Sequence, residues 1–146
     1  MALSAAVVAV VMAVFLGRLL DYMELAERSN METTVSYINS GINTGLAYDM
    51  LEGRPVNIAA GLKRNPFELA RMSPVNFLGE VSGRDLASLE KGSWTYDRMS
   101  NELIYLPKLR RGLHTEDPYG AIRFRLVQAK NKSHYMLVPT SAYTWE

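Results

Sequence analysis

The fold is decided by MALSAAVVAVVMAVFLGRLLDYMELAERSNMETTVSYINSGINTGLAYDMLE, residues 1–52 of a chain of 146. Residues 1–17 carry no charge, and the remainder places apolar side chains at three- and four-residue steps, the pattern of an amphipathic helix. No proline precedes Pro55, and Gly53 and Arg54 complete a typical helix stop. We therefore expect one helix from about residue 2 to 52, about 75 Å long and partly protruding.

The apolar start of this helix admits three interpretations. A cleaved signal peptide fits poorly, because no basic residue precedes the run and residues 14–17 offer no small-x-small cleavage site. A buried core helix is the second, since the run is slightly shorter than the ~20 residues that span a bilayer. We favour the third, a membrane helix that continues through Leu19 and Leu20 while Arg18 reaches back to the interface.

After Pro55 the sequence predicts short elements. Two short helices are expected at 57–63 and 66–71, the second with Asn65 as its N-cap. The expected strands are 94–97 and 103–107, paired as a hairpin, then 122–126, then 135–138 after a turn at 130–132.

The expected fold is therefore α+β. A long protruding N-terminal helix packs by its C-terminal half on a small antiparallel sheet of about four strands. The chain divides into a hydrophobic half of the helix at 1–24, an amphipathic half at 25–54, and a globular domain at 55–146. The stripe that should cover the sheet consists of Val35, Ile38, Ile42 and Leu46.

Residues 33–48 of the helix contain no charge but many small polar side chains. A helix face without charge suggests packing on both sides. Gly41 and Gly45 form a small-xxx-small pair that permits close approach of another helix, although we favour the interpretation that they admit a neighbour from the same domain.

The segment LGRLLDYMELAE (16–27), together with the apolar start, resembles the long first helix of type IV pilins and pseudopilins. The blocks NPFEL (65–69), NFLGE (76–80), GSWTYD (92–97) and LIY (103–105) resemble pilin-like proteins of proteobacteria, so the resemblance covers residues 2 to about 106. It implies a helix half in the membrane and half packed on a small sheet domain. It also implies assembly into a filament whose core is a bundle of these helices.

Several predictions about partners and location are implied by this resemblance alone. The partners would be identical or homologous pilin subunits and the pilus assembly machinery. The chain would cross the bacterial inner membrane once before assembly, and would then form an extracellular or periplasmic filament with a role in cell adhesion. The alternatives are a minor pilin, a type II secretion pseudopilin, or an unrelated membrane-anchored binding module.

The chain departs from the family pattern at its start. Family precursors carry a basic leader that ends in glycine, followed by Phe-Thr-Leu-Ile-Glu, and the sequence begins just after that glutamate would stand. Either the start is truncated or misassigned, which we favour, or this subunit dispenses with the glutamate. Gly17 stands where family helices often have proline. The chain has no cysteine to close a C-terminal disulfide loop, and Glu116 and Asp117 are too few for a calcium cage.

Six residues of the helix are candidates for a role in assembly: Gly17, Arg18, Glu24, Glu27, Arg28 and Glu32. Gly17 is expected to act as a joint, with helix broken or stretched around residues 12–24 in the assembled state, because glycine costs roughly 1 kcal/mol inside a helix. The three glutamates are expected to protrude and to face Arg18 or Arg28 of a neighbouring subunit.

Enzyme chemistry is not indicated, and we expect no catalytic residue, cofactor or metal. With no cysteine and only His114 and His134, no spacing suits a metal ligand pair. The match of Ser88 and Lys91 to a serine-x-x-lysine pattern has no accompanying motif. Trp94, Tyr96 and Tyr105 could stack on a ligand, but cross-strand core pairs are the favoured interpretation.

The net charge of +1 argues against a general nucleic-acid binder. The charge is unevenly divided, because residues 1–54 hold 3 basic and 6 acidic residues whereas residues 55–146 hold 13 basic and 9 acidic ones. The excess of positive charge on the domain has three interpretations. It keeps the domain soluble, or it mediates contacts between the domain and the helix of a neighbouring subunit. Attraction to DNA is the third.

Overall fold

The computed structural model describes residues 2–83, 86–130 and 134–146. In chain order the elements are α1 (Ala2–Leu51), α2 (Ile58–Gly61), α3 (Pro66–Leu69), β1 (Phe77–Val81), the 3-10 helix η1 (Leu86–Ser88), β2 (Ser93–Asp97), β3 (Glu102–Leu106), β4 (Leu113–Thr115), β5 (Ile122–Gln128), β6 (Tyr135–Pro139) and β7 (Tyr143–Trp145). The predicted α+β class is confirmed. The expected turn at 130–132 falls mostly outside the described residues.

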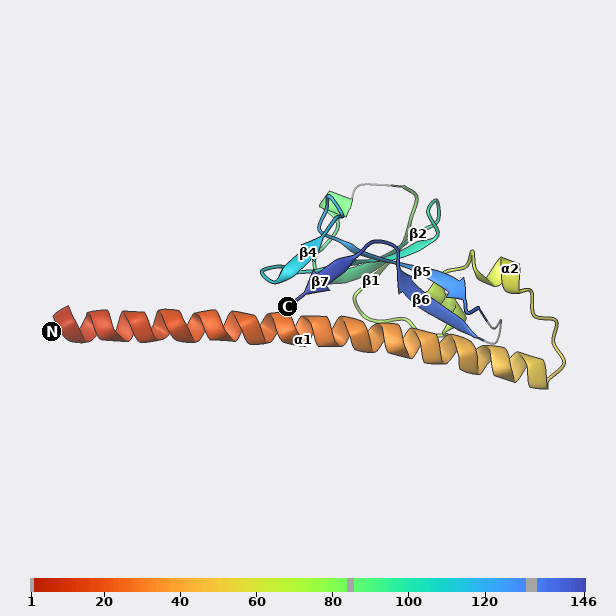
Figure 1. Ribbon diagram of the computed structural model, residues 1–146, viewed down its shortest axis with the longest axis horizontal. Coiled ribbons are helices and arrows are strands. Elements are labelled where there is room, and N and C mark those ends of the chain that lie inside the picture. Colours follow the sequence, from red (N-terminus) through yellow and green to blue (C-terminus); the bar gives the residue numbers. More distant parts are fainter. Residues whose placement is uncertain (1, 84–85, 131–133) are drawn as a thin grey trace.

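The single long helix is also confirmed. Helix α1 runs unbroken along one side of the molecule, and the sheet domain covers only its C-terminal half, so that the N-terminal half projects (Figure 1). The helix stops where the sequence predicted, because Gly53 takes φ +68° and the Arg54 amide bonds back to the Asp49 carbonyl at 2.9 Å.

The sheet is larger than expected. It has five strands in the order β1-β2-β3-β5-β6, and a separate two-stranded sheet pairs β4 with β7. The predicted β2–β3 hairpin is confirmed, and β5 and β6 lie where the sequence placed them. The purely antiparallel expectation is wrong at one edge, since β1 pairs with β2 in parallel after a crossover through η1.

Helix α1 supplies one wall of the core. Of the predicted stripe, Ile38 and Ile42 are at most 4% exposed, whereas Val35 and Leu46 are only partly buried, and all four pack in the core with the aromatic face of the sheet. Met31 is buried beside them. Trp94 lies opposite Tyr105 in the register of β2 and β3, with ring centroids 4.8 Å apart, which confirms a cross-strand core pair. A second, smaller cluster under η1 fills the other face of the sheet.

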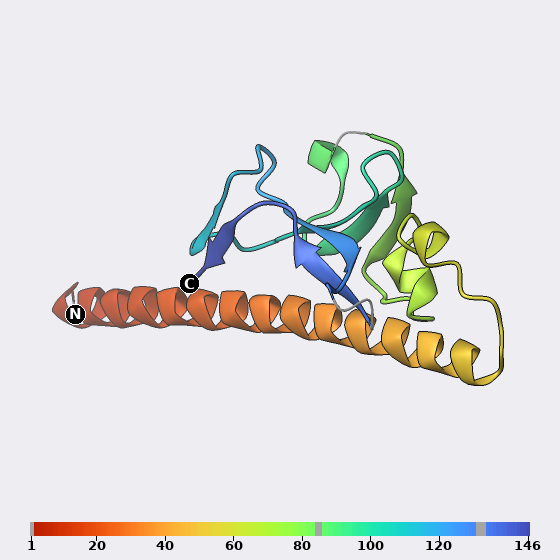
Figure 2. The same cartoon turned by 45° about the vertical axis from the view of Figure 1, so that its right-hand side comes forward.

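Two asparagines of α1 bind the backbone of the edge strand β6. The Asn43 side chain accepts from the Tyr135 amide at 2.8 Å and donates to the Tyr135 carbonyl at 2.8 Å. Asn39 accepts from the Leu137 amide at 2.8 Å. Strand β6 lies beside α1 (Figure 2), and the helix thus satisfies backbone groups that an edge strand would otherwise expose, which accounts for two of the uncharged polar residues in the stretch 33–48.

Helix α3 packs on α1 at Gly41. A Cβ atom on Gly41 would lie 2.9 Å from the Ala70 carbonyl oxygen, whereas one on Gly45 would meet only the Leu69 carbonyl, at 3.9 Å. The favoured interpretation of this glycine pair, a neighbour from the same domain, is therefore confirmed at Gly41. The predicted N-cap is also present, because the Asn65 side chain accepts from the Phe67 amide at 3.0 Å.

Candidate functional site: the exposed apolar helix and its junction with the sheet domain

The N-terminal part of α1 is an exposed apolar surface. Every side chain from residue 4 to 16 is exposed, with exposed fractions of 64% for Val10 and 68% for Phe15. An 18-residue window of this helix has a mean hydropathy of 2.0 and none of it is buried. By length and composition, the helix could therefore cross a membrane.

Gly17 and Arg18 lie at the end of this apolar surface. The helix continues through Gly17 in the single chain, and no atom lies within 4 Å of the position of a Cβ there. Arg18 is exposed, and the described residues include no ion-pair partner for it. The role of Gly17 as a joint in an assembled state stays a prediction.

Glu24 joins the helix to the C-terminal strand. Its side chain is only 5% exposed, and Oε1 accepts hydrogen bonds from the Trp145 indole N–H at 2.8 Å and from the Gly112 amide at 2.9 Å. A carboxylate can be buried here because these donors replace water.

Glu27 holds the loop that connects β3 to β4. One oxygen accepts from the Tyr105 hydroxyl at 2.9 Å and from the Lys108 amide at 2.6 Å, while the other accepts from the Leu109 amide at 2.9 Å. Burial of the Tyr105 phenol, reinforced by its hydrogen bond to Glu27, raises the pKa of Tyr105 above its usual value, so the tyrosine remains a donor.

Two further charged contacts flank these glutamates. Asp21 pairs with Arg111 at 2.9 Å, and both side chains are more than half exposed. Arg28 pairs with Glu32 at 2.9 Å and also donates to the Trp145 carbonyl. Glu24 does not pair with Arg28, four residues farther along the helix, because Glu24 is turned toward the sheet domain.

The expectation that Glu24 and Glu27 protrude is therefore wrong, whereas Glu32 is exposed as expected. Glu24 lies seven residues before Met31 and fourteen before Ile38, so helical spacing already placed it on the buried stripe. Sequence reasoning missed its partners, the Gly112 amide and the Trp145 indole, because they lie 88 and 121 residues away along the chain. The role of the six helix residues in assembly stays a prediction.

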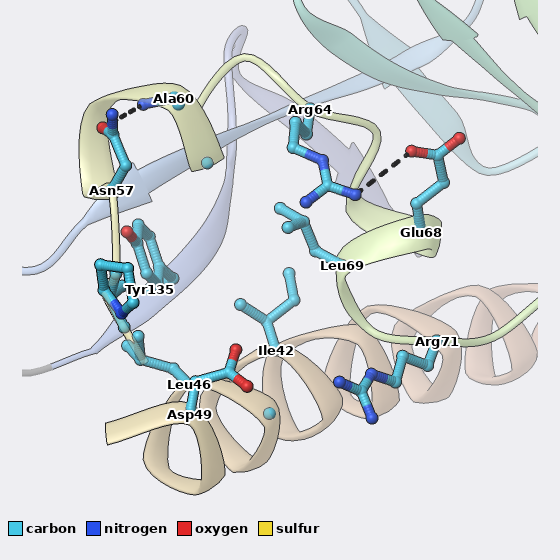
Figure 3. Close-up of a pocket in the computed structure, with 14 residues that line it drawn as sticks. Ile42, Leu46, Asp49, Asn57, Ala60, Arg64, Glu68, Leu69, Arg71 and Tyr135 are labelled. Carbon is cyan, nitrogen blue, oxygen red and sulfur yellow. Dashed lines mark hydrogen bonds and ion pairs between the residues drawn. The ribbon is translucent and has the colours of Figure 1, made fainter. Parts of the chain in front are cut away.

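One cavity, of about 420 Å³, lies between the C-terminal end of α1, α2 and α3. Its ionised side chains are largely paired: Arg64 faces Glu68 at 3.7 Å (Figure 3), and Asp49 bonds to Arg54 at 3.2 Å. Its floor is apolar, with Ile42, Leu46 and Leu69. The cavity brings together no nucleophile with an adjacent base.

The described residues place no group of three or more histidine, cysteine or carboxylate side chains where they could hold a metal ion. Ser88 ends the 3-10 helix η1, and Lys91 follows three residues later, between η1 and β2.

Comparison of the chain with protein-family models, with curated proteins and with solved structures found no match.

Proposed function

We propose that the chain is a structural subunit of a type IV pilus-like filament. The N-terminal part of α1 anchors it in the bacterial inner membrane before assembly. The same apolar surface then bundles with the helices of identical or homologous subunits, delivered by a pilus assembly machinery, in an extracellular or periplasmic filament.

One observation carries the proposal: a helix segment of some 20 Å that is apolar on all sides and touches nothing in the single chain. Burying a large aliphatic side chain is worth about 1.5–3 kcal/mol, and this segment exposes Val7, Val8, Val10, Val11, Met12, Val14, Phe15 and Leu16. Such a surface requires either a bilayer or other apolar helices.

A filament subunit meets both environments in succession, first the bilayer and then other apolar helices. From Ala2 to Leu20 the helix contains a single charge, Arg18, and measures about 28 Å, close to the ~30 Å hydrocarbon core of a bilayer. A helix that is apolar all round also packs equally well against several neighbours, as a bundle at the centre of a filament requires. The resemblance to pilins noted for residues 16–27 supports the same conclusion.

The test compares two exposed valines in cells that express the full chain. Val11→Asp places a charge in the middle of the apolar segment, at a cost of about 3 kcal/mol for membrane insertion. It should move the chain out of the membrane fraction and abolish sheared filaments seen by electron microscopy. Val75→Asp, at a fully exposed position of the sheet domain, is the matched control and should change neither.

Equal filament yield from both variants would refute the proposal. Membrane-bound chain with no filament at the cell surface, but with a secretion defect on deletion, would favour the pseudopilin alternative instead.

A further inference from the structure

The cavity between the C-terminal end of α1, α2 and α3 has the dimensions of a small-molecule site. Its volume is about 420 Å³, and pockets that bind small molecules measure roughly 300–1,000 Å³. Its apolar floor of Ile42, Leu46 and Leu69 suits an apolar body. The position of α2 in Figure 1 shows that the cavity lies at the end of α1 away from the projecting apolar segment, and so outside the part proposed to enter the membrane.

A buried tyrosine presents an unpaired hydroxyl to this cavity. Tyr135 is only 6% exposed, and a Cβ atom on Gly61, which also lines the cavity, would lie 3.5 Å from its hydroxyl oxygen. The backbone of Tyr135 bonds to Asn43, whereas its hydroxyl has no hydrogen-bond partner among the described residues. In the same part of the chain, no side-chain polar atom that is sealed from solvent lacks a partner, so this hydroxyl opens into the cavity.

The protonation of this hydroxyl follows from its burial. Burial raises the pKa of Tyr135 above its usual value, so the phenol keeps its proton at neutral pH. It can therefore donate a hydrogen bond to an oxygen of a bound molecule.

Arg71 supplies an unpaired positive charge at the rim of the cavity. The other ionised side chains that line the cavity, Asp49, Arg64 and Glu68, each have an oppositely charged partner. Arg71 is exposed, and the described residues include no ion-pair partner for it. An anionic group is the partner that this guanidinium lacks.

Arg71 also occupies a backbone position that normally belongs to glycine. Helix α3 ends in a Schellman motif, in which the Arg71 amide bonds to the Glu68 carbonyl at 3.1 Å and the Met72 amide bonds to the Phe67 carbonyl at 3.0 Å. The motif holds Arg71 at φ +54°, in the left-handed region that favours glycine. An arginine here carries a conformational cost that glycine would avoid, and such strained residues cluster at ligand-binding positions.

We propose that the cavity binds a small carboxylate with an apolar body and a second oxygen acceptor, the chemistry shared by an acylated hydrophobic amino acid and by the C-terminal end of a peptide. The carboxylate pairs with Arg71, the apolar body covers the floor, and the carbonyl oxygen accepts from the Tyr135 hydroxyl. Figure 3 shows this order, because Ile42 and Leu69 lie between Tyr135 and Arg71 in that view. The inference goes beyond the proposed filament function and does not depend on it.

The test uses N-acetyl-phenylalanine, titrated into the full chain in lipid nanodiscs and followed by broadening of the ligand's NMR signals, with empty nanodiscs as the blank. A Kd on the order of 1 mM is expected for a molecule of about 15 non-hydrogen atoms. N-acetyl-phenylalaninamide, which lacks the negative charge, should bind at least tenfold more weakly. Acetyl-Ala-Ala-Phe distinguishes the two sources of this chemistry: tighter binding than N-acetyl-phenylalanine assigns the site to a peptide end, and equal or weaker binding assigns it to a free acylated amino acid.

Two variants test the assigned residues. Arg71→Gly should weaken binding of N-acetyl-phenylalanine at least tenfold, should leave binding of the amide unchanged, and should raise the melting temperature, because glycine relieves the positive φ. Tyr135→Phe should weaken binding of both ligands severalfold and leave the melting temperature unchanged, because its hydroxyl has no hydrogen bond to lose. Lys63→Gln is the matched control, since Lys63 is exposed and does not line the cavity, and it should change neither quantity.

Three outcomes overturn the inference. They are no binding of N-acetyl-phenylalanine to the unsubstituted chain at about 10 mM, tenfold above the expected Kd; equal affinity of that chain for the acid and the amide; or an affinity for the acid that Arg71→Gly leaves unchanged. A purely structural role of Arg71 would lower the melting temperature of Arg71→Gly, which also contradicts the inference. The filament proposal stands or falls separately, by the membrane insertion and filament yield of Val11→Asp.

Discussion

Replacing Glu24 by alanine should detach the C-terminal strand β7 from helix α1. The substitution removes the acceptor of two hydrogen bonds, from the Trp145 indole and from the Gly112 amide. Trp145 is only 4% exposed, so its N–H would lose its partner without gaining full access to water.

The magnitude follows from these two donors. An unsatisfied buried donor costs about 1–3 kcal/mol, so Glu24→Ala should lower the free energy of unfolding by about 2–5 kcal/mol. That is a large part of the ~5–15 kcal/mol that stabilises a typical domain. Glu24→Gln keeps an acceptor oxygen and should cost less, about 1 kcal/mol.

The assay is urea unfolding of the full chain in detergent micelles, followed by tryptophan fluorescence. Glu32→Ala is the matched control, because Glu32 is half exposed and its pair with Arg28 should contribute at most about 0.5 kcal/mol. Hydrogen exchange at the Gly112 amide distinguishes local opening of β7 from global unfolding.

A double-mutant cycle isolates the contact. Trp145→Phe removes the indole donor, so Glu24→Ala should cost about 1 kcal/mol less in that background than alone. The reasoning is refuted if Glu24→Ala costs no more than Glu32→Ala, or if the cycle shows no coupling.

Three further outcomes are expected. Gly41→Ala should lower the melting temperature, because its Cβ would meet backbone atoms of the α3 cap at 2.9 Å, whereas Gly45→Ala should be neutral or should stabilise the helix by up to about 1 kcal/mol. Burial opposes ionisation of Asp97, but hydrogen bonds from two amides and a serine hydroxyl outweigh it and hold the pKa of Asp97 below its usual 3.8. Its contribution to stability is therefore present above the unfolded-state pKa and is lost as the pH falls through the folded-state pKa, so Asp97→Asn should flatten the acid limb of an unfolding titration. Deleting residues 1–20 should give a folded, soluble monomer by circular dichroism and sedimentation. Deleting residues 1–24 should give a less stable monomer, because it also removes Glu24 and its hydrogen bond to Trp145 of β7.

The helix was predictable because its signals are local. The absence of proline before Pro55, the positive φ available to Gly53, and the spacing of Ile38 and Ile42 each act within one or two turns. The β2–β3 hairpin was predictable for the same reason, since its turn and both strands lie within 15 residues.

The parts that sequence reasoning missed depend on distant segments. Strand β1 shows no clean alternation of buried and exposed residues, because it contains Gly79, which takes φ +94° at a register shift. Its parallel pairing with β2 is set by a crossover connection and not by a tight turn. Strands β4 and β7 have three residues each, too few for a period to show. Glu24 and Glu27 looked like solvated charges because their partners, which are three backbone amides, the Trp145 indole and the Tyr105 hydroxyl, lie 78 or more residues away along the chain.

The junction has a mechanical consequence for any assembly built on the helix. The sheet domain is attached to α1 at two levels, by Glu24 and Glu27 near its middle and by Asn39 and Asn43 farther along. These levels are about 28 Å apart from Glu24 to Asn43, so the domain cannot pivot about a single contact. By helical spacing Glu24 lies on the same face of α1 as Ile38 and Ile42, whereas Asn39 and Asn43 lie toward one flank, so the domain is held across one side of the helix. Loosening either level should therefore broaden the spread of domain positions in a filament before it weakens the bundle of helices.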